Sequence, residues 1–138
     1  MTTLSDAIKA ALENDSALAA LLTGGIHNDV EEISRQNTPT AFDADMEIKP
    51  CALIKIGTEI PLRGYTTSVQ TPLTIYFYQR EGNSVIEPAI GLAYADLNEE
   101  KIGAGVWSIQ YDNSIFQQRD TALDCALGSL RFVAMRLR

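Results

Sequence analysis

The clearest pattern of hydrophobic and polar positions runs through residues 72–80, which read P-L-T-I-Y-F-Y-Q-R. Apolar and hydroxyl-bearing side chains alternate there with the two-residue period of a β-strand. One face of this strand is fully apolar and consists of Leu73, Ile75 and Phe77. The other face carries hydroxyl groups and consists of Thr74, Tyr76 and Tyr78. Because tyrosine combines a large ring with a polar tip, this second face is typical of a surface that is covered but not dry.

Two short helices are predicted at the start of the chain. Thr3 followed by Asp6 resembles a capping box, and apolar residues then recur at helical spacing, at Leu4, Ile8, Ala11 and Leu12. Asp15 is suited to cap a second turn, whose apolar residues are Leu18, Leu21 and Leu22. The pair Gly24-Gly25 ends this turn, because glycine accepts the left-handed backbone of a helix end.

The remaining regular elements alternate with two long irregular segments. Strands are predicted over 51–56, 106–112 and 130–138, and a helix is predicted from Ser84 or Glu87 to Asn98, whereas 119–129 fits a strand or a helix equally well. Residues 26–50 show no sustained period and are acidic. Residues 57–70 form a connection that is long for a compact domain, and we expect a loop or an extended hairpin arm.

This order of elements predicts one α+β domain over residues 1–138. Its sheet is expected to be mostly antiparallel, with about four to five strands and with the helices packed on one face. Several strands carry apolar or aromatic residues on both faces, yet the helices are too few to cover both. We therefore expect the uncovered face to meet another subunit. The residues assigned to that contact are Thr74, Tyr76, Tyr78 and Trp107.

Composition and charge narrow the class of protein. Of the 138 residues, 46% are hydrophobic, which is typical of a globular chain, and no apolar run approaches the roughly 20 residues that span a bilayer. We expect no membrane association, and the N-terminus lacks the basic start of a signal peptide. The net charge of −7 disfavours tight binding of nucleic acid, because no Lys/Arg stripe is present to neutralise phosphates. Cys51 and Cys125 have no metal or redox spacing, so we expect buried thiols in a cytosolic protein.

No catalytic, metal or nucleotide motif is recognisable. His27 is the only histidine, and neither a nucleophile elbow nor a paired signature accompanies it. Residues 43–47 read D-x-D-x-E but lack the glycine and the distal glutamate of a calcium loop. The glycines form neither G-x-G-x-x-G nor a P-loop. A stacking platform for single-stranded nucleic acid would need an electropositive groove as well as aromatic residues. We therefore expect no cofactor and no enzymatic activity.

The order of features resembles the tail-terminator, or tail-completion, family of long-tailed bacteriophages. The resemblance covers nearly the whole chain, and it rests on the pattern of sequence features and not on a diagnostic motif. The matching elements are L-x-x-A-I-K-A-A-L from Leu4, the stop at Gly24-Gly25-Ile26, P-C-A-L-I-K-I-G from Pro50, T-I-Y-F-Y from Thr74 and the helix after it, and R-F-V-A-M-R-L-R from Arg131. The acidic stretch 28–49 is longer than expected of the shortest members.

The resemblance implies a non-enzymatic virion protein, assembled in the host cytoplasm, that forms a ring, typically a hexamer. Such a ring caps the tail tube at its head-proximal end, stops its polymerisation and meets the head–tail connector proteins, while DNA passes through without specific binding. Arg63 and Tyr65 would then contact a neighbour or the tail tube. Acidic residues would line the lumen or an outer surface, and the candidates are Glu31, Glu32, Asp43, Asp45 and Glu47.

Two other functions remain open at this stage. A head-closure or neck protein also forms a ring on the DNA path, and the sequence separates it poorly from a tail terminator. A small α+β ligand-binding or enzyme domain would instead need a deep pocket with converging polar groups, for which the 57–70 loop is the expected cover.

Overall fold

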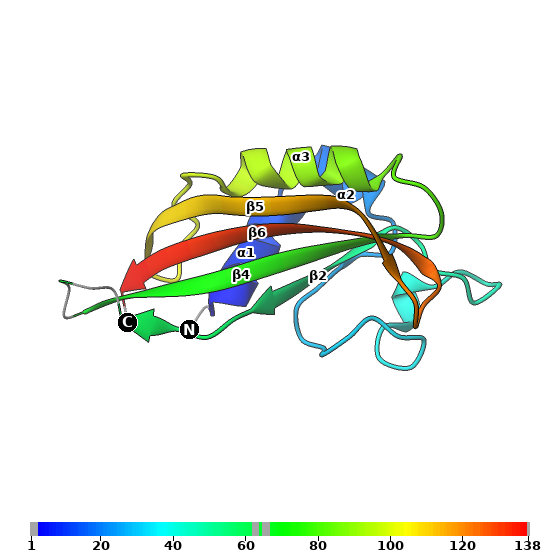
Figure 1. Cartoon of the computed structure of the whole chain (residues 1–138), viewed down its shortest axis with the longest axis horizontal. Helices are drawn as coiled ribbons and strands as arrows, with labels where there is room; N and C mark the ends of the chain where they lie inside the picture. Colours follow the sequence, from blue (N-terminus) through cyan, green and yellow to red (C-terminus); the bar gives the residue numbers. More distant parts are fainter. Residues whose placement is uncertain (1–2, 62–63, 65–66, 138) are drawn as a thin grey trace.

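A computed structural model describes residues 3–61, 64 and 67–137, and it shows three helices packed on a six-stranded sheet (Figure 1). The elements in chain order are α1 (Leu4–Glu13), α2 (Ser16–Leu21), β1 (Ile26–His27), the 3-10 turn η1 (Pro39–Ala41), β2 (Cys51–Ile56), β3 (Ile60–Pro61), β4 (Ser68–Gln79), α3 (Ile86–Leu97), β5 (Val106–Asp120) and β6 (Cys125–Leu137).

The predicted α+β class is confirmed, while the predicted strand count is wrong. The sheet has the order β1-β2-β4-β6-β5, and β3 pairs with β4 beside this path. All pairs are antiparallel except β1 with β2, so the sheet is mixed. The two strands missed in the sequence, β1 and β3, have two residues each, which is too short to show a period. The second of them pairs Ile60 with Gln70, so the described part of the 57–70 connection extends the β2–β4 hairpin.

Strands β5 and β6 are longer than the pattern predicts. Residues 106–112 were expected as a strand, but β5 continues to Asp120, and β6 begins at Cys125 inside the segment that fitted a strand or a helix. The cause lies in the exposure of β5 at the edge of the sheet. Every described residue from Gln110 to Arg119 except Ser114 is exposed, so neither face of the strand requires apolar residues and the alternation disappears.

Two of the three helices begin at the capping residues that the sequence predicts. Thr3 accepts a hydrogen bond from the Asp6 backbone N–H at 3.2 Å, and Asp15 caps α2 by accepting from Ala17 and Leu18. Helix α3 has no capping box. The Oε1 of Gln79, the last residue of β4, instead accepts from the N–H groups of Val85 and Ile86 at 2.8 and 3.2 Å. This cap comes from the preceding strand, so a search for local cap residues misses it.

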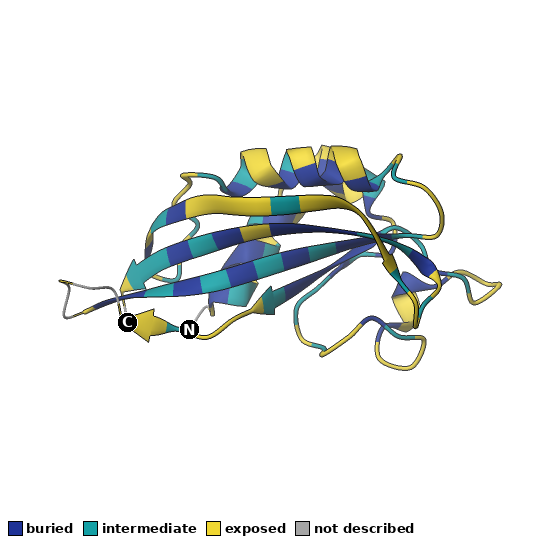
Figure 2. Ribbon diagram, in the orientation of Figure 1, coloured by how far each residue is buried: buried dark blue, intermediate teal, exposed yellow. Residues whose placement is uncertain are grey.

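The main core lies between the helices and one face of the sheet (Figure 2). It includes the predicted apolar face of β4, where Leu73, Ile75 and Phe77 are at most 1% exposed. The same layer contains the buried positions of all three helices and the facing residues of β2, β5 and β6. The prediction that the helices pack on one face is therefore confirmed.

Helix α3 approaches the sheet closely at Gly128 on β6. A Cβ atom at this position would overlap Ile86 Cγ2 and would lie 3.1 Å from Ile90 Cδ1. Glycine is required here because α3 rests directly on the backbone of the strand.

Replacing Gly128 with Ala is expected to lower the free energy of unfolding by about 1–3 kcal/mol, because the added methyl group forces α3 away from β6. Gly91 offers a matched control. It lies in the same helix, and its Cβ would meet nothing within 4 Å. We expect Gly91→Ala to stabilise the protein by about 0.5–1 kcal/mol through helix propensity. Urea unfolding of both variants tests this, and equal effects of the two substitutions would contradict the packing at Gly128.

Candidate assembly surface

The second face of the sheet is covered at one end by the acidic segment itself. Residues 26–50 were expected to be irregular. Apart from β1 they contain only η1 and a single β-bridge between Phe42 and Ile48. They nevertheless supply a second apolar cluster against the sheet. Its buried members are Ile33, Ala41, Phe42, Ile48, Cys51, Leu53, Tyr78 and Cys125. We call residues 28–50 the acidic cover.

The expectation that Tyr78 is exposed is wrong. We expected this ring to be exposed on a single subunit, but it is only 7% exposed because the cover lies over it. Burial is also the main cause that raises the pKa of its phenol, and the neighbouring Asp120 acts in the same direction. Tyr78 is therefore a core residue of its own chain. The sequence could not show this, because the cover carries its apolar anchors without a helical or strand period.

Thr74 lies beyond the cover, on the part of the second face that stays open, whereas Tyr76 lies at the border and also packs against the apolar cluster of the cover. Both are half-buried, and they line a hollow of about 330 Å³ with Ile115 of β5 and Arg131 of β6. Arg131 is itself paired with Asp112, with a separation of 3.1 Å between nitrogen and oxygen. The structure thus brings two of the four predicted contact residues together at one site, and their role in a subunit contact stays a prediction.

Trp107 lies at another part of the sheet. Its side chain reaches from β5 across β6, and its indole N–H donates to Ser68 Oγ on β4 at 3.2 Å. Ser68 is six residues from Thr74 along the same strand face, a separation of about 20 Å. The Trp107 side chain is 39% exposed. It therefore does not form one compact patch with Thr74 and Tyr76.

The five acidic candidates all belong to the cover, and they differ in their local contacts. Glu31 contacts Lys55 at 3.3 Å and Glu47 contacts Arg80 at 2.6 Å. The Asp43 carboxylate accepts hydrogen bonds from the backbone N–H groups of Asp45 and Glu47, which closes a tight turn. The four residues Glu31, Glu32, Asp43 and Asp45 are exposed. Arg63 and Tyr65 lie outside the described residues.

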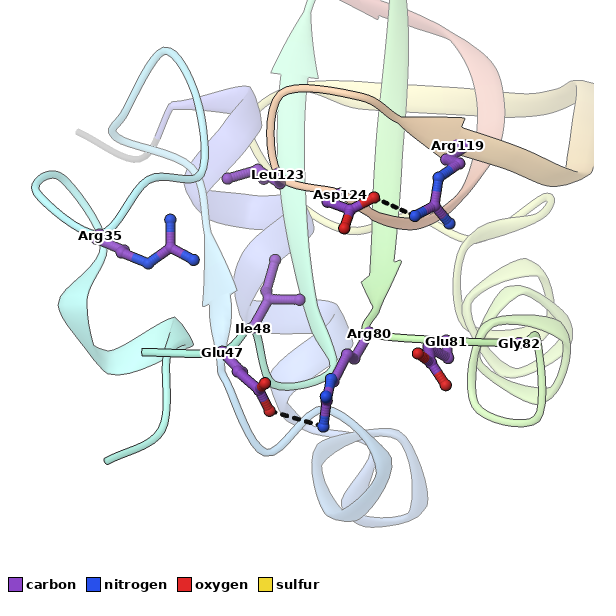
Figure 3. Close-up of a pocket in the computed structure, with 9 residues that line it drawn as sticks. All are labelled: Arg35, Glu47, Ile48, Arg80, Glu81, Gly82, Arg119, Leu123 and Asp124. Atoms are coloured by element: carbon purple, nitrogen blue, oxygen red, sulfur yellow. Dashed lines mark hydrogen bonds and ion pairs between the residues drawn. The ribbon is translucent and has the colours of Figure 1, made fainter. Parts of the chain in front are cut away.

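One cleft of about 400 Å³ lies between the cover, the β4–α3 loop and the β5–β6 turn (Figure 3). Three arginines line it, and each is held by a neighbour. Arg80 pairs with Glu47, Arg119 pairs with Asp124, and Arg35 donates to the Met46 carbonyl while lying 5.1 Å from the centre of the Phe42 ring. Three acidic residues, Glu47, Glu81 and Asp124, balance their charge. The cleft is therefore a network that ties the cover to the sheet, and its electroneutral lining gives no specific reason to bind an anion.

The sequence interpretation included residues 106–112 as a strand, but it missed the full length of β5 and its outer position in the sheet. Four of its large hydrophobic side chains are 39–44% exposed, and they are Trp107, Tyr111, Ile115 and Phe116. Tyr111 and Phe116 also line an apolar hollow of about 310 Å³ between β5 and α3, together with Tyr94 of the helix. Figure 2 shows this strand exposed along most of its length. In the sequence, this exposed surface is indicated by the apolar pair Ile115-Phe116, which stands among polar residues.

Among the described residues that the sequence singled out for catalysis or metal binding, the structure assembles no reaction centre. No cluster of three or more His, Cys, Asp or Glu side chains is placed to hold a metal ion among them. His27 Nε2 lies 2.9 Å from the Gly24 carbonyl oxygen, which fixes the ring in a local turn. Cys51 and Cys125 are free thiols at 0% exposure, and burial raises the pKa of Cys51 to about 12 and that of Cys125 to about 11. In the described part of the chain, no helix is long and apolar enough to cross a membrane.

Comparison with known proteins finds similarity in fold but not in sequence. No family model and no curated protein matches the sequence. Among solved structures, the fold is similar to that of a chain in the virion of a native gene transfer agent (GTA) particle. The TM-score is 0.67 at 15% sequence identity, and the match covers 99% of this chain and 96% of that chain. The similarity therefore extends over the whole fold, including the strands that the sequence pattern missed.

The cover can be tested through the two cysteines beneath it. Replacing Ile33, which is 2% exposed, with Ala removes an anchor of the cover, and a large-to-small change of this kind costs about 2–5 kcal/mol. We expect thiol labelling of native protein at pH 8 to be at least about tenfold faster than in the parent, because the cover opens more often.

Two controls separate this opening from general destabilisation. Met46→Ala changes an exposed side chain of the same segment and should leave labelling unchanged. Leu12→Ala creates a cavity in the helix-side core, and we expect a smaller effect on labelling for an equal loss of stability. Equal acceleration by Ile33→Ala and Leu12→Ala would show that the thiols react only after global unfolding.

Proposed function

We propose that this protein is a structural component of a phage-like virion, and that it forms a homo-oligomeric ring, of six subunits, that caps the tail tube. In this role the ring terminates polymerisation of the tube and joins it to the head connector. The observation that carries the proposal is the match of the whole fold to a chain of a gene transfer agent virion, which leaves almost no part of either chain unaligned.

The surface chemistry supports a binding role over catalysis. The cleft and the two hollows described above are lined by paired charges or by aromatic side chains, and none of these three gathers a nucleophile, a base and an oxyanion donor. Four of the nine exposed large hydrophobic side chains of the described residues instead lie on one strand, β5, which is typical of a protein–protein contact. These features favour an assembly protein over the ligand-binding or enzyme domain considered from the sequence.

The acidic surface suits a ring through which DNA passes. Glu31, Glu32, Asp43 and Asp45 are exposed on the cover, and the chain carries a net charge of −7. A lumen lined by such residues repels phosphate and lets DNA pass without binding. We assign Thr74, Tyr76 and Trp107 to contacts with neighbouring subunits, and Arg63 and Tyr65 to a neighbour or to the tube protein.

The test is assembly with purified tail tubes of the cognate phage or gene transfer agent. Native mass spectrometry of the protein alone and with tubes should give a hexamer, on its own or bound to tube ends. Added during polymerisation, the protein should shorten the tubes and appear by electron microscopy at one end only.

Two outcomes would contradict the proposal in different ways. Binding to the isolated head connector, with no effect on tube length, would identify a head-closure ring. A protein that stays monomeric at high concentration and binds neither tubes nor connectors would exclude both ring functions.

A further inference from the structure

Two carboxyl groups meet where α2 packs against α3 (Figure 1). Asp15 is the N-terminal capping residue of α2, and Asp96 lies in the last turn of α3. The two side chains are within hydrogen-bond distance of each other. Two ionised carboxylates repel, and they have no proton with which to form a hydrogen bond. Such a contact is therefore stable only when one of the two groups is protonated.

Burial favours the proton on Asp96. Its Oδ2 atom is buried and has no hydrogen-bond partner among the described residues. An ionised oxygen without a donor is costly to bury, whereas a protonated carboxyl group can itself donate. Burial is the main cause that raises the pKa of Asp96 to about 7, and the hydrogen bond to Asp15 and the charge of Asp15 act in the same direction.

Asp15 is suited to keep the negative charge. Its Oδ1 atom accepts hydrogen bonds from the backbone N–H groups of Ala17 and Leu18, at 3.0 and 3.1 Å. The hydrogen bond with Asp96 is the main cause that lowers the pKa of Asp15, and the two backbone bonds lower it further. The pair therefore titrates as a unit, and it retains one proton over a wide range of pH.

Few other charged groups lie near the pair. A hollow of about 400 Å³ beside Asp96 has a neutral lining from α1, and its other charged members are Glu100 and Lys101, which have opposite signs. Glu13 and Glu99 are exposed and do not line this hollow. Helix α2 itself carries no charged side chain. The capping carboxylate of α2 is therefore the charge to which Asp96 responds.

Helix α2 is the element that this contact can hold or release. It has six residues, and Leu18 is its only buried side chain. A helix this short is marginal by itself, so it depends on its cap and on packing against its neighbours. Two like charges at the point where it meets α3 would weaken that packing.

We propose that Asp15 and Asp96 share one proton and form a pH-sensitive latch that holds the start of α2 against α3. While the proton is present, Asp96 donates it to the Asp15 carboxylate and the latch is closed. When the proton is lost, the two carboxylates repel each other and α2 opens, while the helix-side core stays folded. This inference does not depend on the proposed ring.

The direction of the pH dependence follows from the two pKa shifts. The folded chain binds the Asp96 proton more tightly than the unfolded chain does. The stability that this proton contributes is therefore full below the ordinary pKa of 3.8, and it is lost as the pH rises through about 7. The lowered pKa of Asp15 contributes stability above 3.8, and this part is lost as the pH falls. The latch is thus closed in weakly acidic solution and opens above about pH 7.

Carbon-13 NMR of the aspartate carboxyl groups tests the shared proton. We expect the Asp96 signal of the parent protein to titrate close to pH 7. In Asp15→Asn it should titrate at lower pH, because this variant removes the charge but keeps a residue that caps helices well. An Asp96 carboxyl group of the parent that titrates in the ordinary aspartate range, near about pH 4, would overturn the proposal even if every variant failed to fold.

Hydrogen exchange of the α2 amides, corrected for the intrinsic effect of pH on exchange, tests the opening. For the parent we expect the opening equilibrium of α2 to rise at least about tenfold between about pH 6 and about pH 8.5. Asp96→Asn keeps a donor toward Asp15 at every pH, so its α2 should open equally at both. Glu100→Gln is the matched control, because it removes a carboxylate of the same hollow and should keep the pH dependence of the parent.

Three results of this exchange experiment decide between a latch and general destabilisation. Opening that rises with pH in α2 alone, and that Asp96→Asn abolishes, would support the latch. An equal rise in the amides of the central strand β4 would show global unfolding and would overturn it. The same tenfold rise in Asp96→Asn would also overturn it. None of these results depends on whether the protein forms a ring, so the latch and the proposed function fail separately.

Discussion

The structure depends on one constraint, which is that the apolar face of the central sheet and the apolar end of its second face must both be kept from water. The three helices cover one face, and Gly128 lets α3 rest directly on β6. The acidic cover protects one end of the other face, where Tyr78 and the two cysteines lie. The second face beyond this cover and the outer strand β5 remain for other molecules. The parts of the sheet that the helices and the acidic cover leave open thus decide where the protein can make contacts.

The sequence predicted the elements whose burial is one-sided. The face of Leu73, Ile75 and Phe77 alternates because only that face meets the helices, and Thr3 and Asp15 cap helices through local contacts. Strands β1 and β3 were missed because two residues show no period, and the length of β5 was missed because its exposed faces select for no pattern. The cap of α3 by Gln79 depends on a tertiary approach that no local motif records.

The candidate site was predicted in part for the same physical reasons. The pattern indicated that the helices were too few to cover the sheet, and Thr74 and Tyr76 do line a hollow on its second face, although Tyr76 also packs against the cluster of the cover. The pattern wrongly assigned Tyr78 to the open part as well. The residues that bury it include Ile33, Phe42 and Ile48, which are scattered in the sequence among acids and turn residues and so show no period. Recognising the cover required knowing that these residues meet in space. The same limit applies to β5, whose aromatic residues become a surface only because the strand is outermost.

The central claim is that the contacts left open by a single chain are those through which copies of it join. Hydrogen exchange measured by mass spectrometry on the separated subunit and on the assembled ring tests it most directly. If copies join there, amides of β5 and of the open part of the second face should become protected on assembly, while amides of the acidic cover should not change. Protection that appears only in the cover or on the outer helix surfaces, with β5 still exchanging freely, would contradict it.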